Sequence, residues 1–329
     1  MSRYPAPIAS AVDAALELSI VGSFSRVGSA VRSRIDGWTD PPPDALVGRT
    51  VLITGPTSGL GRVTAEALAD LGARLVLVGR SRAKLDELHD ALIATHGADR
   101  FAVVEADLGS LASVGAAVER ILAGEPRLDV LIDNAGAIYP ERRAGPDGIE
   151  RTFALMVVGP FALEAGLLPL LRASRGRAIA VTSGGMYTQS LDLDDLDSDA
   201  GPWSGPRAYA RAKRAQTALV REWSRRLAGS GVTFDAMHPG WADTPGLAAS
   251  LPGFHRFMGP VLRSPDEGID TIVWLAAHPG SAGISGRLLL DRRSRPFDRA
   301  PHTRLSATDR RRLWDRVVEL SGRPDPVPG

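Results

Sequence analysis

The chain has 329 residues, of which 44% are hydrophobic, enough for one large α/β domain or two small ones with a buried core. The 39 basic and 38 acidic residues leave a net charge of +1, so no overall field recruits nucleic acid or an anionic membrane. The sequence has no cysteine, which excludes disulfides, thiolate nucleophiles and cysteine-ligated zinc. This composition is typical of a reducing compartment, and we expect a cytoplasmic protein.

Residues 1–47 form an N-terminal extension before the repeating strand and helix pattern begins. A weakly amphipathic stretch at residues 8–35 is followed by a proline-rich breaker. Asp13 and Glu17 interrupt the apolar part of this stretch, so no secretion signal is predicted. We expect the extension to pack on the main domain, and residues 8–35 also allow weak peripheral membrane contact.

From residue 49, short apolar strands alternate with helix-length amphipathic segments, as in a parallel, doubly wound sheet. Strands are predicted at residues 50–54, 74–79, 101–105, 130–133, 177–182, 233–237 and 287–290. Helices are predicted at residues 60–71, 82–94, 111–122, 148–171, 207–228 and 265–277. We therefore expect one α/β domain at residues 48–291, with a seven-stranded parallel sheet and helices on both faces. A basic tail with a helix at residues 307–320 would follow as residues 292–329.

Residues 153–171 are almost wholly apolar, which is also the composition of a membrane span. Glu164 is their only charge, and Pro160 and Pro169 interrupt the run. These residues favour a helix buried in the protein, and we expect no integral membrane span.

The first predicted strand runs directly into a glycine-rich turn and then a helix. A pyrophosphate binds backbone N–H groups at a helix N-terminus, and glycines keep side chains out of its way. Strand, turn and helix in this order predict a dinucleotide site at the carboxyl end of the sheet. The residues of this turn are Thr54, Gly55, Thr57, Ser58, Gly59, Leu60 and Gly61.

The end of the second strand bears on the choice of coenzyme. No acidic residue stands where a ribose 2′-hydroxyl would need its partner, and Arg80 lies beside that position. Because an arginine there can pair with a 2′-phosphate, the sequence favours NADP(H) over NAD(H). The alternative is an arginine on a solvated loop of an arginine-rich chain.

Tyr209 and Lys213 are four residues apart on a predicted helix and therefore share one face. A nearby ammonium stabilises a phenolate, so the pair can act in proton transfer near neutral pH. Lys84 is the only other lysine in a chain that uses arginine nearly everywhere, which makes Lys213 more informative. The alternative is an ordinary pair on a helix surface. Ser183 follows the fifth strand, where its hydroxyl could bind a substrate oxygen.

Three more motifs follow later strands. They are Asp107-Leu108 after the third strand, Asn134-Ala135-Gly136 after the fourth and Pro239-Gly240 after the sixth. Together with the Thr-Gly-x-x-x-Gly-x-Gly turn, their types and order resemble the short-chain dehydrogenase/reductase family over nearly the whole chain. The segments 182–186, 238–245, 290–292 and 313–314 are most similar to the branch of retinol dehydrogenases and family member twelve.

This resemblance implies a Rossmann-type fold and a role for each matching residue. Tyr209 would be the proton donor or acceptor, Lys213 would modulate its pKa and bind the ribose, and Ser183 would orient the oxyanion. Asp107 and Leu108 would contact the adenine, the other motif residues would line the coenzyme site, and Thr244 would meet the nicotinamide carboxamide. Thr182 is the alternative hydroxyl to Ser183. Tyr187 is not favoured, because Leu191 stands four residues later, and His238 is interpreted as structural.

Two segments near the expected pocket add to this interpretation. The acidic run at residues 191–197 is read as an inserted, solvated loop at the rim, since no histidine joins it to make a metal site. Residues 247–262 carry Phe254, Phe257 and Met258 and would form a lid, which favours a lipophilic substrate.

One residue departs from the family pattern. Met156 stands where many members have an asparagine three residues before a glycine, here Gly159, and a methionine cannot hold a relay water. We expect an oxidoreductase with an altered proton path, acting on a small carbonyl or alcohol. The alternatives are a non-catalytic NADP-binding regulator and a membrane-attached scaffold that uses residues 8–35. Only analogy suggests a homo-oligomer.

Overall fold

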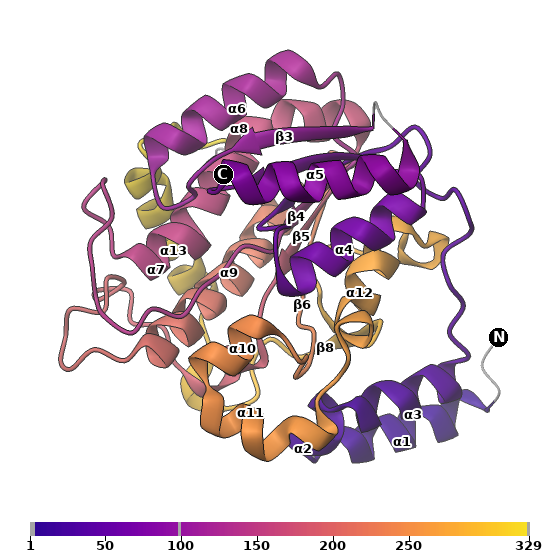
Figure 1. Cartoon of the computed structure of the whole chain (residues 1–329). Coiled ribbons are helices and arrows are strands. Elements are labelled where there is room, and N and C mark those ends of the chain that lie inside the picture. The colour runs from indigo at the N-terminus through magenta and orange to yellow at the C-terminus, as the bar shows by residue number, and fades with distance from the viewer. Residues whose placement is uncertain (1–3, 98–99, 328–329) are drawn as a thin grey trace.

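The computed structural model describes residues 4–97 and 100–327, and its centre is one eight-stranded sheet (Figure 1). The strand order is β3-β2-β1-β4-β5-β6-β7-β8. The strands are β1 (Thr50–Thr54), β2 (Arg74–Gly79), β3 (Phe101–Glu105), β4 (Val130–Asp133), β5 (Arg177–Val181), β6 (Thr233–Met237), β7 (Leu288–Leu290) and β8 (Arg293–Arg295). The first seven are parallel, and β1 lies next to β4. The order therefore reverses at β1, which creates a crevice at the carboxyl ends of β1 and β4.

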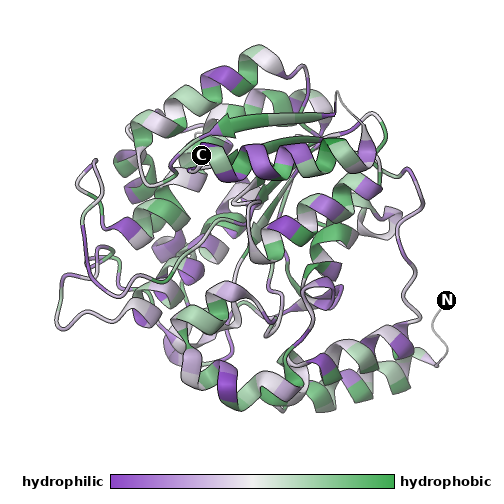
Figure 2. Cartoon of the chain, viewed as in Figure 1, coloured by the Kyte–Doolittle hydropathy of each residue, from purple (hydrophilic) through white to green (hydrophobic). Residues whose placement is uncertain are grey.

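Helices cover both faces of the sheet, which is why its strands are apolar on both sides (Figure 2). One face carries α4 (Gly59–Asp70), α5 (Arg82–His96) and α12 (Pro265–Ala277). The other carries α6 (Leu111–Gly124), α8 (Gly159–Ser174), α9 (Gly205–Arg226) and α13 (Ala307–Ser321). The doubly wound α/β architecture is confirmed.

The predicted number of seven strands was wrong, because β8 pairs antiparallel with β7. The two residues between them, Asp291 and Arg292, both have positive φ, at 55° and 58°. A two-residue hairpin needs this backbone, and the usual sequence sign for it is Asn-Gly or Asp-Gly. Without a glycine, the turn could not be recognised from the sequence. The chain thus passes from the expected domain directly into the expected tail within one hairpin.

The long helix predicted at residues 148–171 is present at Arg151–Ser174, but it contains a π-helical turn near its start. A short helical turn, α7 (Arg151–Phe153), leads into a π-helical turn at Ala154–Val158 and then into α8. A Cβ on Gly159 would collide with the backbone carbonyl of Leu108, so the helix approaches the neighbouring chain too closely for any side chain there. Such π turns widen a helix locally and are frequent at functional sites, and this one contains Met156.

The same segment is the one described helix, Arg151–Ser174, that is long and apolar enough to cross a membrane. Within the structure, 72% of its most apolar window is buried. Its hydropathy therefore matches its place in the core between α6 and α9.

The N-terminal extension forms three helices that pack beside the lower edge of the sheet in Figure 1. They are α1 (Ala6–Glu17), α2 (Ile20–Phe24) and α3 (Arg26–Asp36). In the same view α11 (Pro252–Met258) lies next to α2, and α10 (Pro245–Ser250) lies above α11; these two helices are the segment expected to be a lid.

Candidate active site

The glycine turn has the geometry of a phosphate-binding loop. Gly55 and Gly59 have positive φ, at 64° and 53°, which disfavours other residues. A Cβ on Gly61 would collide with the carbonyl oxygen of Gly55. In the described structure, the side chain of Ser58 makes no capping hydrogen bond with α4, and the first turn of α4 contains no acidic residue. The N-terminal N–H groups of α4 therefore fit an anion such as the coenzyme pyrophosphate.

Asn134 holds this turn against the end of β4. Its Nδ2 donates to the carbonyl oxygens of Thr54 at 3.0 Å and Gly55 at 3.1 Å. The backbone N–H groups of Asn134 and Ala135 donate to Thr54 Oγ1, at 3.0 and 3.1 Å. One amide and one hydroxyl thus connect the two strands that border the crevice, with Gly136 following at its edge.

Lys213 is buried on α9, where its Nζ donates to the carbonyl oxygen of Val181 at 2.7 Å and to Gln216 Oε1 at 3.2 Å. A Cβ on Gly136 would lie 3.6 Å from Nζ, so the ammonium reaches the Asn-Ala-Gly motif. Burial lowers the pKa of Lys213 to about 8, and the attraction of Asp133 opposes this shift.

Tyr209 lies one helical turn before Lys213, whose Nζ is 5.8 Å from the centre of its ring. Burial raises the pKa of Tyr209, and a hydrogen bond with Ser183 partly offsets the rise. We expected the ammonium to lower this pKa, but Nζ points to Val181 and Gln216 instead of the phenol. In this arrangement Tyr209 is a neutral hydroxyl beside Ser183, suited to donating a proton.

Ser183 stands at the carboxyl end of β5, and its Oγ accepts a hydrogen bond from the N–H of Gly185 at 3.2 Å. The two alternative hydroxyls lie elsewhere. Thr182 Oγ1 donates to the carbonyl oxygen of Lys213 at 3.2 Å, and Tyr187 Oη donates to that of Pro296 at 2.8 Å. Ser183 is therefore the hydroxyl that the structure places next to Tyr209.

Met156 lies beside the Asn-Ala-Gly motif and Lys213, since its Sδ would be 3.2 Å from a Cβ on Gly136. Behind it, Asp133 and Glu164 are buried and interact with each other. Burial raises the pKa of Asp133 to about 7 and that of Glu164 well above its usual value. Two carboxyls in one apolar site cannot both ionise, so the pair holds a proton near Lys213. Asp133 was not predicted from the sequence, although an acidic residue at the end of an apolar strand is a visible signal.

The residues expected at the adenosine end of the coenzyme lie just after the carboxyl ends of β2 and β3. Arg80 and Asp107 are exposed, whereas Leu108 is buried. Burial raises the pKa of Tyr139, while the charges of Arg151 and Arg80 and a hydrogen bond from Arg80 oppose this. Arg80 therefore lies close to Tyr139, a residue that was not among those predicted from the sequence.

The loop after β6 approaches the glycine turn from the other side. Gly240 follows Pro239 with φ 72°, and Thr244 Oγ1 caps α10 by accepting from Leu247 N at 3.2 Å. A Cβ on Gly59 would lie 3.6 Å from Thr244, so this loop closes over the turn. His238 is fully buried, and burial lowers its pKa well below the usual value, so it is neutral.

The two segments at the rim differ in character. Acids of the run at residues 191–197 pair with arginines, as in Asp195–Arg211 at 3.3 Å and Asp194–Arg312 at 3.1 Å. No group of three or more metal-binding side chains occurs among the residues that the structure describes. In the expected lid, Phe254 packs edge-on against Trp241 with 5.2 Å between ring centres.

The crevice thus combines an anion-binding turn, a buried ammonium, and a phenol paired with a serine hydroxyl at the ends of adjacent strands. This fold and donor set define a nicotinamide-dependent oxidoreductase, and residues 49–191 match the family described as short chain dehydrogenase. The chain is 38% identical to dehydrogenase/reductase SDR family member 12 from Homo sapiens over 75% of its length and 78% of that protein. We conclude that the chain belongs to the short-chain dehydrogenase/reductase family.

Other relatives point to one branch. Retinol dehydrogenase 14 from Mus musculus is 35% identical over 94% of this chain and 96% of that protein. A Streptomyces protein named as a daunorubicin C-13 ketoreductase is 38% identical over 78% of this chain and 87% of its own. The crystal structure of an uncharacterised protein from Mycobacterium paratuberculosis superposes with a TM-score of 0.68, at 29% identity, over 89% of this chain and 99% of that one. The chain is accordingly an oxidoreductase of the retinol dehydrogenase-like branch.

Proposed function

We propose that this protein is an NADP(H)-dependent oxidoreductase that interconverts a carbonyl and an alcohol on a small lipophilic molecule. The observation that carries the proposal is Tyr209, Ser183 and Lys213 meeting beside the glycine turn. The coenzyme would supply or accept the hydride. Ser183 would hold the substrate oxygen, and Tyr209 would give it a proton during reduction or remove one during oxidation.

Several residues would hold the coenzyme. The N–H groups at the start of α4 would bind the pyrophosphate, and Lys213 would meet the ribose hydroxyls. Arg80, exposed near Tyr139, would pair with a 2′-phosphate, which supports NADP(H) as the coenzyme. The aromatic contact of Trp241 with Phe254 beside the site favours a lipophilic substrate. We also propose a cytoplasmic location, because the chain has no cysteine.

The test is coenzyme consumption with a panel of aldehydes, ketones and alcohols of increasing hydrophobicity. Wild type should turn over at least one class, and Tyr209→Phe should lose about 100-fold or more in kcat while still binding coenzyme. Arg80→Ala should raise KM for NADPH without changing that for NADH. Arg82→Ala is the matched control, because Arg82 is a neighbouring exposed arginine paired with Asp86.

Met156 favours one second candidate, a coenzyme-binding regulator without turnover. In that case the whole panel would give no reaction, although NADPH still raised the melting temperature. Met156→Asn adds a second comparison. If Met156 is what limits proton supply, this variant should turn over faster than wild type, and a variant no faster than wild type would show that position 156 is not limiting. Retention of the protein on lipid vesicles without coenzyme would instead support a membrane-attached scaffold using residues 8–35.

A further inference from the structure

The two ends of the lid segment meet in a short bridge. The N–H of Arg263 donates to the carbonyl oxygen of Trp241 at 2.8 Å, and the N–H of Asp243 donates to that of Arg263 at 2.9 Å. Helices α10 and α11 lie between these ends. The bridge therefore forms the base of a closed loop beside the catalytic residues.

This base is attached to the N-terminal extension through backbone carbonyls at the end of α2. The carbonyl oxygen of Phe24 accepts from the N–H of Trp241 at 2.8 Å and from Nε of Arg263 at 3.0 Å. Arg263 Nη2 also donates to the carbonyl oxygen of Ser23 at 2.9 Å. Both ends of the lid thus bind the same peptide group, and Arg263 lies 239 residues after Phe24 in the sequence.

The ring of Phe24 occupies the space beneath the catalytic serine turn. A Cβ on Gly184, the residue after Ser183, would collide with this ring. The ring also packs edge-on against His238 and Trp241, with 4.6 and 5.8 Å between ring centres, and it is only 3% exposed. Phe24 therefore separates the turn after β5 from the loop after β6 and contacts both.

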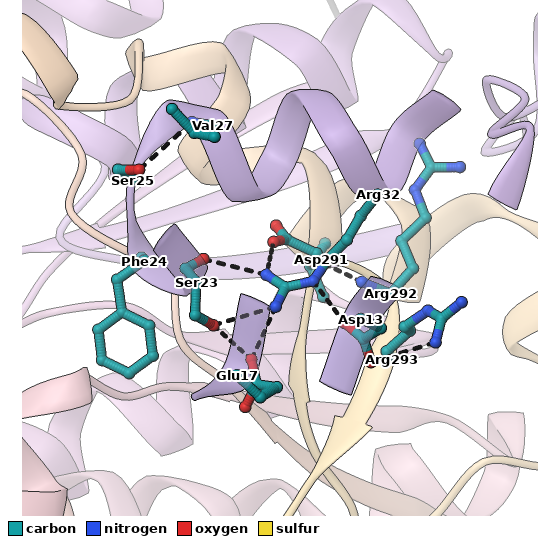
Figure 3. A network of polar contacts seen from close by, with 12 residues as sticks. Asp13, Glu17, Ser23, Phe24, Ser25, Val27, Arg32, Asp291, Arg292 and Arg293 are labelled. Atoms are coloured by element: carbon teal, nitrogen blue, oxygen red, sulfur yellow. Dashed lines mark hydrogen bonds and ion pairs between the residues drawn. The ribbon is translucent and has the colours of Figure 1, made fainter. Parts of the chain in front are cut away.

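Buried ion pairs hold the extension in this position (Figure 3). Arg32 is fully buried and binds Asp13 at 2.7 Å, Glu17 at 2.7 Å and Asp291 at 2.6 Å. Asp291 also binds Arg263 at 2.6 Å. Moving the extension would separate these charges in an apolar interior, which is costly, so its register on the domain is unique.

We infer that Phe24 is a positioning residue of the active site, and that the N-terminal extension thereby supports the turn that carries Ser183 and the base of the lid. Its ring sets the Ser183 turn, and its carbonyl oxygen sets the base of the lid. The inference rests on the proposed function where it concerns turnover. Its geometric part stands on the contacts alone and can be tested without a substrate.

The first experiment compares Phe24→Ala and the milder Phe24→Leu with wild type. We expect kcat to fall about tenfold to 100-fold, because displacing a catalytic group by about 1 Å has that effect, while the Kd for NADPH stays unchanged. Trypsin cleavage after Arg256, an exposed residue of α11, should become several-fold faster as the lid loosens. Phe101→Ala is the matched control, since Phe101 is a buried ring on β3 in the core of the opposite face.

The second experiment uses Gly184→Ala, which places a methyl group against the Phe24 ring. Alone it should lower kcat and the melting temperature, and because both changes act on the same contact, the losses in the double variant with Phe24→Ala should be smaller than the sum of the two single losses. Equal kcat losses and equal Arg256 cleavage in Phe24→Ala and Phe101→Ala, with additive melting shifts in the double variant, would overturn the inference. If wild type shows no turnover, the proposed function fails, but cleavage and the double variant still decide the role of Phe24.

Discussion

Lys213 should cost this protein stability near neutral pH, and Lys213→Met measures how much. Burial lowers its pKa from 10.5 to about 8. Between these values the unfolded chain binds more protons than the folded one, so the stability of wild type rises with pH. The resulting loss in the free energy of unfolding is complete below about pH 8 and disappears as the pH passes 10.5. From the two pKa values it amounts to about 3 kcal/mol at pH 7 and about 1 kcal/mol at pH 10.

Methionine at position 213 removes the free-energy loss caused by the lowered lysine pKa, but it also removes two hydrogen bonds, those to Val181 and Gln216. Because each bond contributes about 1 kcal/mol, losing both lowers the stability of the variant by about 2 kcal/mol. Lys213→Met should therefore be about 1 kcal/mol more stable than wild type at pH 7 and about 1 kcal/mol less stable at pH 10. Its turnover should fall about 100-fold or more at both values.

Urea unfolding of the coenzyme-free protein at pH 7, 8, 9 and 10 measures this change of sign. Lys84→Met is the matched control, because Lys84 is the only other lysine and lies exposed on α5. The control should stay close to wild type throughout. A stability difference for Lys213→Met that keeps the same value from pH 7 to pH 10 would refute the argument that burial sets this lysine's pKa.

Three further outcomes follow from other sites. Glu164→Gln removes a carboxyl whose pKa is raised well above 4.5 by burial and by the charge of Asp133. Because an unfolded glutamate ionises above pH 4.5 while buried Glu164 keeps its proton, wild type loses stability as the pH rises above this value. The advantage of the variant in urea unfolding should therefore grow between pH 4 and pH 7, and a constant advantage would contradict the buried proton. Gly61→Ala should abolish NADPH binding measured by calorimetry, because the added methyl would strike a backbone carbonyl in the phosphate turn. Arg32→Met leaves buried carboxylates, Asp291 among them, short of a partner and should lower the free energy of unfolding by about 3–5 kcal/mol; a loss within 1 kcal/mol of an exposed-arginine control would argue against this role.

Local chemistry made much of the fold predictable from the sequence. The helix predicted at residues 265–277 has these bounds in the structure, where Ser264 and Glu267 form a capping box and Pro265 follows the cap. The glycine turn was recognised because its three glycines stand between an apolar strand and an amphipathic helix. In both places a few neighbouring residues determine the backbone, so no distant contact had to be known.

The missed features depend on contacts between distant segments. The hairpin at Asp291-Arg292 takes a left-handed backbone without glycine, and Arg32, Arg263 and Asp270 hold its side chains. The π turn at Ala154–Val158 forms where the helix crosses the chain at Leu108. The local sequence does not show which distant residues contact these two turns. Hydrophobic periodicity indicates which face of an element is buried, but it does not indicate which segment covers that face.

The placement of the candidate site residues shows the same division. Spacing on one helix was enough to put Tyr209 and Lys213 on a common face, but the direction of the ammonium depends on Val181 and Gln216, which close around it only in the folded chain. The pKa of Tyr209 is therefore raised, where the spacing predicted a lowered value, because burial of the phenol dominates and the ammonium points elsewhere.

Buried arginines fix the position of the N-terminal extension on the domain. A short helical segment that buries few large apolar side chains, Phe24 and Ile35 among them, could slide or rotate on an apolar surface at little cost. Arg32 and Arg263 meet carboxylates from α1 and from the β7–β8 hairpin, and guanidinium–carboxylate bonds form only in defined orientations. Buried ion pairs add little net stability, but a misplaced extension would leave charges unpaired. The ion pairs therefore select a single position for the segment, and in that position Phe24 lies beneath the turn that carries Ser183.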